Sequence, residues 1–176
     1  MDSSPPPPDH AAECTAPESA ELRLDSIAAQ VEAVDRLIGL AQQRLCVFDR
    51  DLAEGGWERA ERAGALAAFL RRARGARASI IVHDTRYLEG SCPRILSLLR
   101  VYGHAMEIWR TGPEARGASD ALVIADGAHA LHRYHVGQPR ATLTLAMPQV
   151  AKPLVLRFEE IWATGEPALG GSVLGL

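Results

Sequence analysis

Apolar residues recur at intervals of three and four along several long stretches of the chain. This spacing lines them up on one face of a helix, so it predicts amphipathic helices that pack on the protein's own core. The predicted helices run from Leu22 to Ala41, from Glu58 to Arg74, from Pro93 to Tyr102 and from Val150 to Ala163.

A short apolar run follows each of the first three helices. The runs Arg44–Asp49, Ala78–His83 and His104–Trp109 are too short for helices and predict buried strands. Because helix and strand alternate over this half of the chain, the pattern predicts parallel strands covered by helices.

After Gly112-Pro113 the pattern changes to closely spaced strands. Leu122–Asp126 and Ala130–His135 are separated by the turn signal Asp126-Gly127, which predicts a hairpin, and Thr142–Ala146 is a further strand. The predicted fold class is therefore α/β, with a mixed, mostly parallel β-sheet flanked by helices.

Residues 22–165 are expected to form one domain between two irregular ends. Residues 1–21 contain four consecutive prolines and few large apolar side chains, which predicts a disordered acidic tail. The acidic residues of this tail all precede the first basic residue, Arg23, and are Asp2, Asp9, Glu13, Glu18 and Glu21. Residues 166–176 are rich in glycine and are expected to form an irregular tail.

The formal net charge is −3, and removing the acidic tail leaves a nearly neutral body. A nucleic-acid partner is therefore not expected, although Arg71, Arg72, Arg74 and Arg77 form a local cluster that we interpret as a solvated helix end. No apolar stretch is long enough for a membrane span, and no secretory signal opens the chain.

Three widely spaced cysteines predict reduced thiols in a cytoplasmic protein rather than a disulfide framework. Arginine outnumbers lysine by eighteen to one, a bias that we interpret as bacterial.

The order of elements resembles one half of the phospholipase D superfamily. The similar segments are Val34–Phe48, Ala73–Asp84 and Ala151–Trp162, which match the opening helix and strand, the second strand and the closing helix of such domains. The resemblance extends from about Val31 to Gly165 and implies a phospholipase D-like half-domain.

The superfamily is named for a His-x-Lys-x-x-x-x-Asp motif, and this chain departs from it. The resemblance places Asp126 in the Asp position, Ser119 in the His position and Ala121 in the Lys position. In the family the His attacks phosphorus and the Lys neutralises phosphate oxygens, so their loss implies a relative without the usual catalysis.

Histidines concentrated after the degenerate motif are one set of substitute residues. Strand alternation places His129, Arg133 and His135 on one face, with His132 and Tyr134 on the other. Two imidazoles and a guanidinium on one face, with Arg140 nearby, suit phosphate binding or phosphoryl transfer. No Glu or Cys joins them at ligand spacing, so neither a metal nor another cofactor is predicted.

A second candidate site is His83-Asp84, at the end of a predicted parallel strand, where open α/β sheets place their ligands. Arg86 and Arg94 are near in sequence and are candidate ligand-binding residues. A polar cap at the end of a strand is the structural alternative.

The leading hypothesis is a non-catalytic phospholipase D-like domain that acts as a ligand-binding, regulatory or protein-interaction module, with a phosphate-containing ligand or a protein as partner. One alternative is a diverged phosphodiesterase or phosphotransferase that uses His83, His129 or His135. A third hypothesis is a structural homodimerisation domain, since half-domains of this superfamily pair to build one site.

Overall fold

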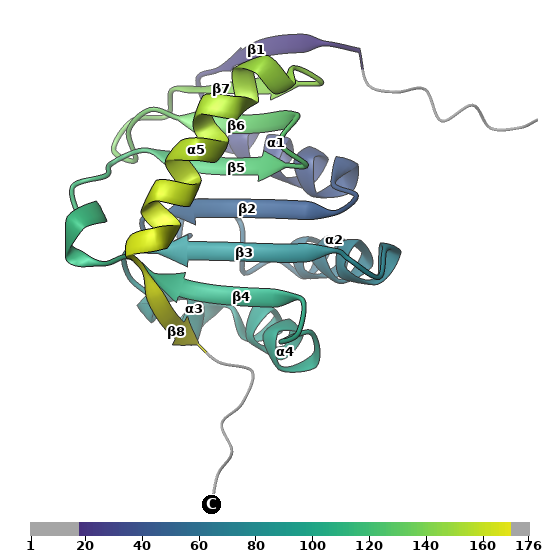
Figure 1. Cartoon of the computed structure of the whole chain (residues 1–176), viewed down its shortest axis with the longest axis vertical. Helices are drawn as coiled ribbons and strands as arrows, with labels where there is room; N and C mark the ends of the chain where they lie inside the picture. Colours follow the sequence, from purple (N-terminus) through teal and green to yellow (C-terminus); the bar gives the residue numbers. More distant parts are fainter. Residues whose placement is uncertain (1–17, 170–176) are drawn as a thin grey trace, which may run out of the picture.

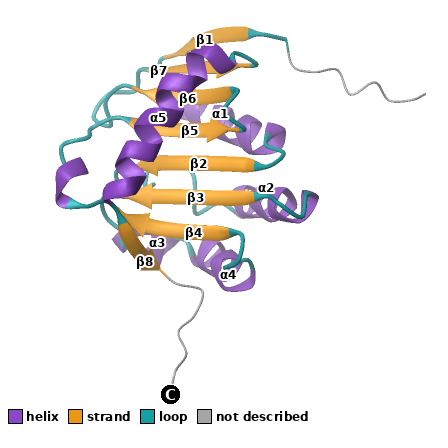
Figure 2. Ribbon diagram, in the orientation of Figure 1, coloured by secondary structure: helices purple, strands orange, loops and turns teal. Residues whose placement is uncertain are grey.

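The computed structural model describes residues 18–169, which contain one eight-stranded sheet with helices on both faces (Figures 1 and 2). The strands are β1 (Ala20–Leu24), β2 (Arg44–Asp49), β3 (Arg77–Val82), β4 (Met106–Arg110), β5 (Ala121–Ala125), β6 (His129–Arg133), β7 (Ala141–Leu145) and β8 (Glu166–Leu169). The helices are α1 (Ile27–Leu40), α2 (Ala60–Arg72), α3 (Arg86–Ser91), α4 (Pro93–Val101) and α5 (Pro148–Thr164), with one 3-10 turn, η1 (Pro113–Ala115).

The strand order across the sheet is β1-β7-β6-β5-β2-β3-β4-β8. The prediction of an α/β fold is confirmed, but the prediction of a mostly parallel sheet is wrong. Only β2 with β3 and β3 with β4 pair in parallel, and the five other neighbouring pairs are antiparallel. The reason is the connections: helical crossovers join β2, β3 and β4, whereas the later strands β5, β6 and β7 follow one another as a meander.

The predicted hairpin is confirmed as β5 and β6, which pair antiparallel from Ala121 with Arg133 to Ala125 with His129. Its turn contains Asp126 and Gly127 with φ angles of 53° and 66°. Two successive positive φ values are typical of the tight turn that an Asp-Gly pair forms between twisted strands.

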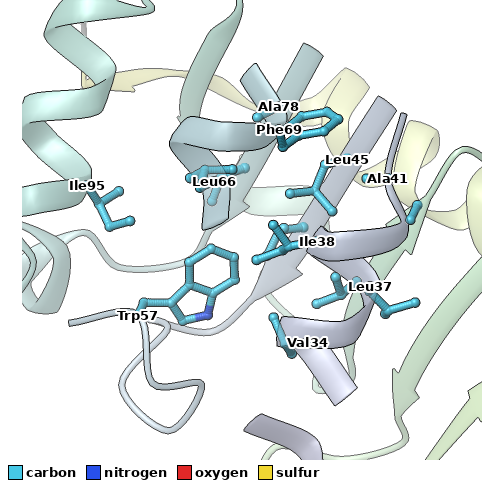
Figure 3. Packing of buried hydrophobic residues seen from close by; sticks show 14 of the residues in the cluster. Val34, Leu37, Ile38, Ala41, Leu45, Trp57, Leu66, Phe69, Ala78 and Ile95 are labelled. Atoms are coloured by element: carbon cyan, nitrogen blue, oxygen red, sulfur yellow. The ribbon is translucent and has the colours of Figure 1, made fainter. Parts of the chain in front are cut away.

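The first four helices cover one face of the sheet, and α5 runs diagonally across the other (Figure 1). The larger core lies between the sheet and α1, α2 and α4, where Figure 3 shows apolar side chains of helices and strands meeting around Trp57. These buried residues include Val34, Leu37, Ile38, Leu45, Leu66, Phe69, Ala78 and Ile95. A smaller core under α5 contains Phe48, Ile81, Leu122, Phe158 and Ile161.

Both ends of the described chain are more ordered than the sequence pattern predicts. Residues 20–24 form β1, which pairs with β7, instead of ending a disordered tail and beginning a helix. The helix begins at Ile27 because Ser26 caps it, with its hydroxyl accepting a hydrogen bond from the Ala29 amide at 3.2 Å.

At the other end, residues 166–169 form β8 beside β4 rather than an irregular tail. Both differences arise from pairing with a strand remote in sequence, which local patterns do not reveal. The expected irregularity of residues 1–17 and 170–176 lies outside the described residues.

Candidate functional site

The motif positions lie at the two ends of β5. Because β5 is antiparallel to β2, its first residue lies at the end of the sheet where β2, β3 and β4 finish. We refer to this as the motif end. Ser119 is exposed just before β5, and Ala121 is buried as its first residue. Asp126 follows β5 at the opposite end, so it does not approach Ser119.

Asp126 holds the loop between α1 and β2. Its carboxylate accepts hydrogen bonds from the backbone amides of Gln42, Gln43 and Arg44, at 2.7, 2.8 and 2.8 Å. The Asp126 amide in turn donates to the Arg44 carbonyl at 2.8 Å. These contacts give the one retained residue of the motif a role in joining β5 to β2.

Ala121 lines a small hollow on the side of the sheet covered by α1. The hollow measures about 30 Å³, close to the space that one water molecule needs, and its polar lining includes Asp49, Glu54 and Arg133. Burial raises the pKa of the Asp49 carboxyl, although the amides of Leu52 and Asp51 donate to it. A phosphate group has neither the space nor the positive charge that it needs here.

Arg133 was predicted to bind ligand, but its guanidinium is already fully engaged inside the protein. Nη1 donates to the Glu54 carboxylate at 2.6 Å, Nε donates to the Gln138 carbonyl at 2.8 Å, and Nη2 donates to the Val136 carbonyl. The side chain is buried, so these bonds compensate for the desolvation of its charge.

His83 lies at the end of β3 with both ring nitrogens in hydrogen bonds. Nε2 is 2.8 Å from the Ala118 carbonyl, and Nδ1 is 2.6 Å from the Thr111 hydroxyl. Because a carbonyl only accepts, Nε2 carries a proton, and in the neutral ring Nδ1 accepts from Thr111. The edge of the Phe48 ring also packs on the imidazole, with centroids 5.3 Å apart. His83 therefore ties β3 to the loop before β5.

Asp84 and Arg86 pair with each other at the surface. Arg86 donates to both oxygens of Asp84, and these bonds lower the pKa of the Asp84 carboxyl to about 2. The Arg86 side chain is 90% exposed. Arg94 lies on α4 with Nη1 3.5 Å from the Glu58 carbonyl. Arg140 is exposed before β7, so the candidate arginines do not form one cluster.

The three residues expected on one face of the hairpin are not brought together. His129 begins β6 and Arg133 ends it, so a strand rise of about 3.4 Å per residue separates them by roughly 14 Å. Burial lowers the pKa of His129, whose Nδ1 accepts from the Ala146 amide at 3.0 Å. His135 is exposed beyond the strand, where its Nδ1 accepts from the Gly137 amide at 2.9 Å.

A polar cluster that the sequence analysis did not predict lies at the motif end, on the side covered by α5. Arg157 of α5 donates to both oxygens of Asp120, at 2.6 Å each, and His132 Nε2 lies 3.6 Å from the same carboxylate. The Tyr134 ring packs 4.7 Å from the His132 ring, and its hydroxyl lies 2.6 Å from that of Thr142. No local signal reveals the central ion pair, because its partners are 37 residues apart.

The side chain of Asp120 is 8% exposed, whereas that of Arg157 is 43% exposed. Burial alone would raise the pKa of the Asp120 carboxyl, but hydrogen bonds from Arg157 and His132 outweigh burial and hold the pKa below its ordinary value. A carboxylate stabilised in this way is a poor general base. The residues of the cluster that other molecules can contact are Tyr134, His132 and Arg157, which form its exposed rim.

Several solved structures share this fold. Nuc of Salmonella typhimurium, a phospholipase D family member, aligns with a TM-score of 0.57 at 14% identity, over 86% of this chain and 99% of its own. NucT of Helicobacter pylori aligns with a TM-score of 0.56 at 9% identity, over 86% and 100% of the two chains. The fold is therefore the phospholipase D-like α/β fold predicted from the sequence.

The archaeal chromatin protein TrmBL2 aligns with a TM-score of 0.66 at 13% identity, over 89% of this chain. This chain spans 57% of the length of that protein. A search of curated proteins found no match. The chain belongs to the family described as domain of unknown function DUF7931, whose model matches residues 26–169. No helix in the described part of the chain is long and apolar enough to cross a membrane.

The contacts of Asp126 predict a structural role for this motif residue. Asp126→Gly removes the acceptor of three amides while tolerating the positive φ, and should lower the free energy of unfolding by about 1–3 kcal/mol. Asp126→Asn, which keeps one acceptor oxygen, should lose less. Urea denaturation measures both, and a glycine variant as stable as the parent would contradict the assignment.

The Asp120 pair predicts acid-sensitive stability. An unfolded Asp titrates near about 3.9, and the folded pKa of Asp120 is lower. The stabilisation is therefore complete above about pH 5 and is lost as the pH falls through 4 towards the folded pKa. Asp120→Asn should destabilise the protein at neutral pH and flatten this acid branch.

Asp84→Asn is the matched control, because it removes an ion pair at the surface. In about 1 M salt, which screens exposed pairs, Asp84→Asn should have little effect while Asp120→Asn keeps most of its effect. Chemical denaturation from about pH 3 to about pH 7 measures the stability of both variants. This range runs from roughly one unit below the pKa of an unfolded Asp to neutrality. Equal behaviour of the two variants would contradict a buried role for Asp120.

Proposed function

We propose that this chain is a non-catalytic phospholipase D-like module that binds a protein partner in a regulatory role. The observation that carries the proposal is the hollow beside Ala121. It holds about 30 Å³, and its one arginine already donates to three internal acceptors. Phosphodiester chemistry needs a nucleophile, a cation for the phosphate and room for both, and this end of the sheet supplies none of them together.

The nucleophile position supports the same conclusion. Ser119 is exposed, and no hydrogen bond joins its hydroxyl to a base within residues 18–169. His83, whose Nε2 contacts the carbonyl of Ala118, the residue before Ser119, is held there and by the Thr111 hydroxyl. A serine hydroxyl needs an adjacent base to become nucleophilic, so this arrangement favours binding over catalysis.

The exposed rim of Tyr134, His132 and Arg157 is the surface that we assign to binding. Tyr134 is 56% exposed, yet its hydroxyl and ring are fixed by Thr142 and His132. Tyrosine and arginine are enriched among the residues that dominate protein interfaces, and a pre-ordered side chain loses little entropy on binding. The ion pair with Asp120 neutralises Arg157, which suits a protein surface better than a phosphate group.

Two alternatives stay open to test. A diverged phosphodiesterase would use His83, His129 or His135, and the convergence of His132 and Arg157 on Asp120 is the arrangement that most favours an enzyme. A homodimerisation domain would present an apolar surface. Between residues 18 and 169 the large exposed hydrophobic residues come from four places: Leu22 of β1, Val101 of α4, Tyr134 after β6 and Leu156 of α5. We propose a bacterial cytoplasmic location, which the buried free thiols of Cys46 and Cys92 suit.

Phosphodiesterase activity separates the proposal from its enzymatic alternative. The chain should not hydrolyse bis-para-nitrophenyl phosphate faster than a buffer blank, because the hollow beside Ala121 offers neither an unpaired cation nor a nucleophile–base pair. The His83→Ala, His129→Ala and His135→Ala variants should be equally inactive. Hydrolysis by the parent chain that disappears in one of these folded variants would overturn the proposal and identify the catalytic histidine.

Site-specific photo-crosslinking in cells tests the binding surface. A benzoylphenylalanine at Tyr134 should crosslink to another protein, identified by mass spectrometry, whereas the same group at exposed Val101 of α4 should not. Adducts that contain only a second copy, at twice the 19.0 kDa mass of the chain, would favour the homodimer. If both positions give no adduct, or the same adducts, the assignment of this surface is wrong.

A further inference from the structure

Two arginines stand side by side at the end of the sheet opposite the motif end. The parallel register of β2 and β3 pairs Arg44 directly with Arg77, and both side chains are exposed. Like charges on neighbouring strands repel one another, so such a pair is unfavourable unless anions lie close. Arg44 has Glu159 of α5 at 3.2 Å, whereas within residues 18–169 Arg77 has no ion-pair partner.

The two arginines line the largest hollow described on the protein. It measures about 730 Å³, and its lining includes Ser79, His104 and Glu107 as well as the pair. It lies on the face crossed by α5, because Arg44 and Arg77 are an even number of residues from Cys46 and Ile81 of the smaller core. The helix runs diagonally and leaves the beginning of β3 and β4 outside its path (Figure 1). We call this the arginine hollow.

More positive charge lies just before β3 in the chain. Arg71 and Arg74, at the end of α2 just before β3, are exposed and have no ion pair with any residue from 18 to 169. Arg72 differs, because it donates to the carbonyls of Gly39 and Ala41 at the end of α1. Arg72 is therefore held by the end of α1, whereas the three other exposed guanidiniums of the cluster have no carboxylate partner within residues 18–169.

The topology brings an acidic segment to the same end of the sheet. β1 runs in the same direction as β2 and β3, since four antiparallel pairings separate it from β2. Ala20 therefore lies at the end where β2 and β3 begin (Figure 1). The chain that leads into Ala20 carries Asp2, Asp9 and Glu13, followed by exposed Glu18, and it contains no lysine or arginine.

Residues 1–17 are long enough to span the distance from the beginning of β1 to Arg77 at the beginning of β3. Five strand spacings of about 4.8 Å place β3 roughly 24 Å from β1. Seventeen residues extend to at most about 56 Å, at about 3.3 Å per residue. Tethering also raises the local concentration of the carboxylates, so modest attraction is sufficient for binding.

We propose that residues 1–17 dock on the arginine hollow, with their carboxylates against Arg44 and Arg77. The segment supplies the anion that Arg77 lacks and adds to the single carboxylate, Glu159, that pairs with Arg44. A nucleic acid fits the surface less well, because the body of the protein is close to neutral. The segment would also shield the arginines from other anions.

A spin label on Cys14 tests the proposal in the whole chain. Cys14 lies in the segment, while Cys46 and Cys92 are buried, and burial raises their pKa values to about 11, so a thiol reagent at neutral pH selects Cys14. In an NMR spectrum of the amide groups, the signals of Arg77, Ser79 and His104 should lose most of their intensity. The signals of Asp84 and Thr111, at the motif end, should keep theirs.

Charge variants identify the contact. The double change Arg44→Gln and Arg77→Gln should restore the signals of Ser79 and His104, and so should neutralising Asp2, Asp9 and Glu13 as amides. The matched control, Arg86→Gln with Arg94→Gln, removes the same charge at the other end and should leave the broadening unchanged. Broadening that persists without Arg44 and Arg77, or that falls elsewhere, would overturn the proposal.

A short DNA duplex added to the labelled chain tests the competing occupant. At physiological salt the duplex should leave the label in place. If it displaces the label and shifts the signals of Arg77 and Ser79, the arginine hollow is a nucleic-acid site and the proposal fails.

Discussion

The carboxylate of Asp126 fixes the junction between the two halves of the sheet. It accepts three consecutive amides at the entrance to β2 while its own backbone begins the turn after β5. The parallel strands β2, β3 and β4 lie on one side of this junction, and the antiparallel strands β5, β6, β7 and β1 lie on the other. The register of β5 against β2 determines which residues meet at the motif end. Asp126 thus has a structural role at this junction.

The two buried charges at the motif end, Arg133 and Asp120, are satisfied internally. Arg133 has Glu54 and two carbonyls, and Asp120 has Arg157 and His132. A buried charge is costly unless it is paired, so these two side chains need partners within the fold. The result is a firmly held surface whose exposed members are an aromatic ring and a neutralised guanidinium. Such a surface suits recognition of another molecule more than chemistry on it.

At the opposite end of the sheet, exposed charges are only partly paired. Arg44 and Arg77 are adjacent and exposed, and the described residues provide one carboxylate, Glu159, for the two of them. Parallel pairing makes this arrangement unavoidable, because the first residues of neighbouring strands share one register position. The antiparallel strands place Ala20, the first residue of β1, at this same end. The two ends of one sheet therefore differ in how completely their charges are compensated.

Much of the architecture follows from local patterns in the sequence. The apolar periodicity predicts α1, α2, α4 and α5, the short apolar runs predict β2, β3 and β4, and Asp126-Gly127 predicts the hairpin. The resemblance to the phospholipase D superfamily also rests on such segments, and the fold confirms it. These features are accessible because each depends on residues within about one helix turn or one strand of each other.

The sheet order and the candidate site depend on contacts between residues distant in the chain. The antiparallel placement of β5 beside β2, the edge strands β1 and β8, and the pairing of Asp120 with Arg157 all join remote segments. Alternation along β6 correctly separates His132 from Arg133, but it does not show that Arg133 turns inward to Glu54. By itself the sequence determined four of the helices and the inner strands, and it places Ser119 and Ala121 where the motif has His and Lys. Only the tertiary structure decided which charges find partners, because pairing depends on distance in space and not along the chain.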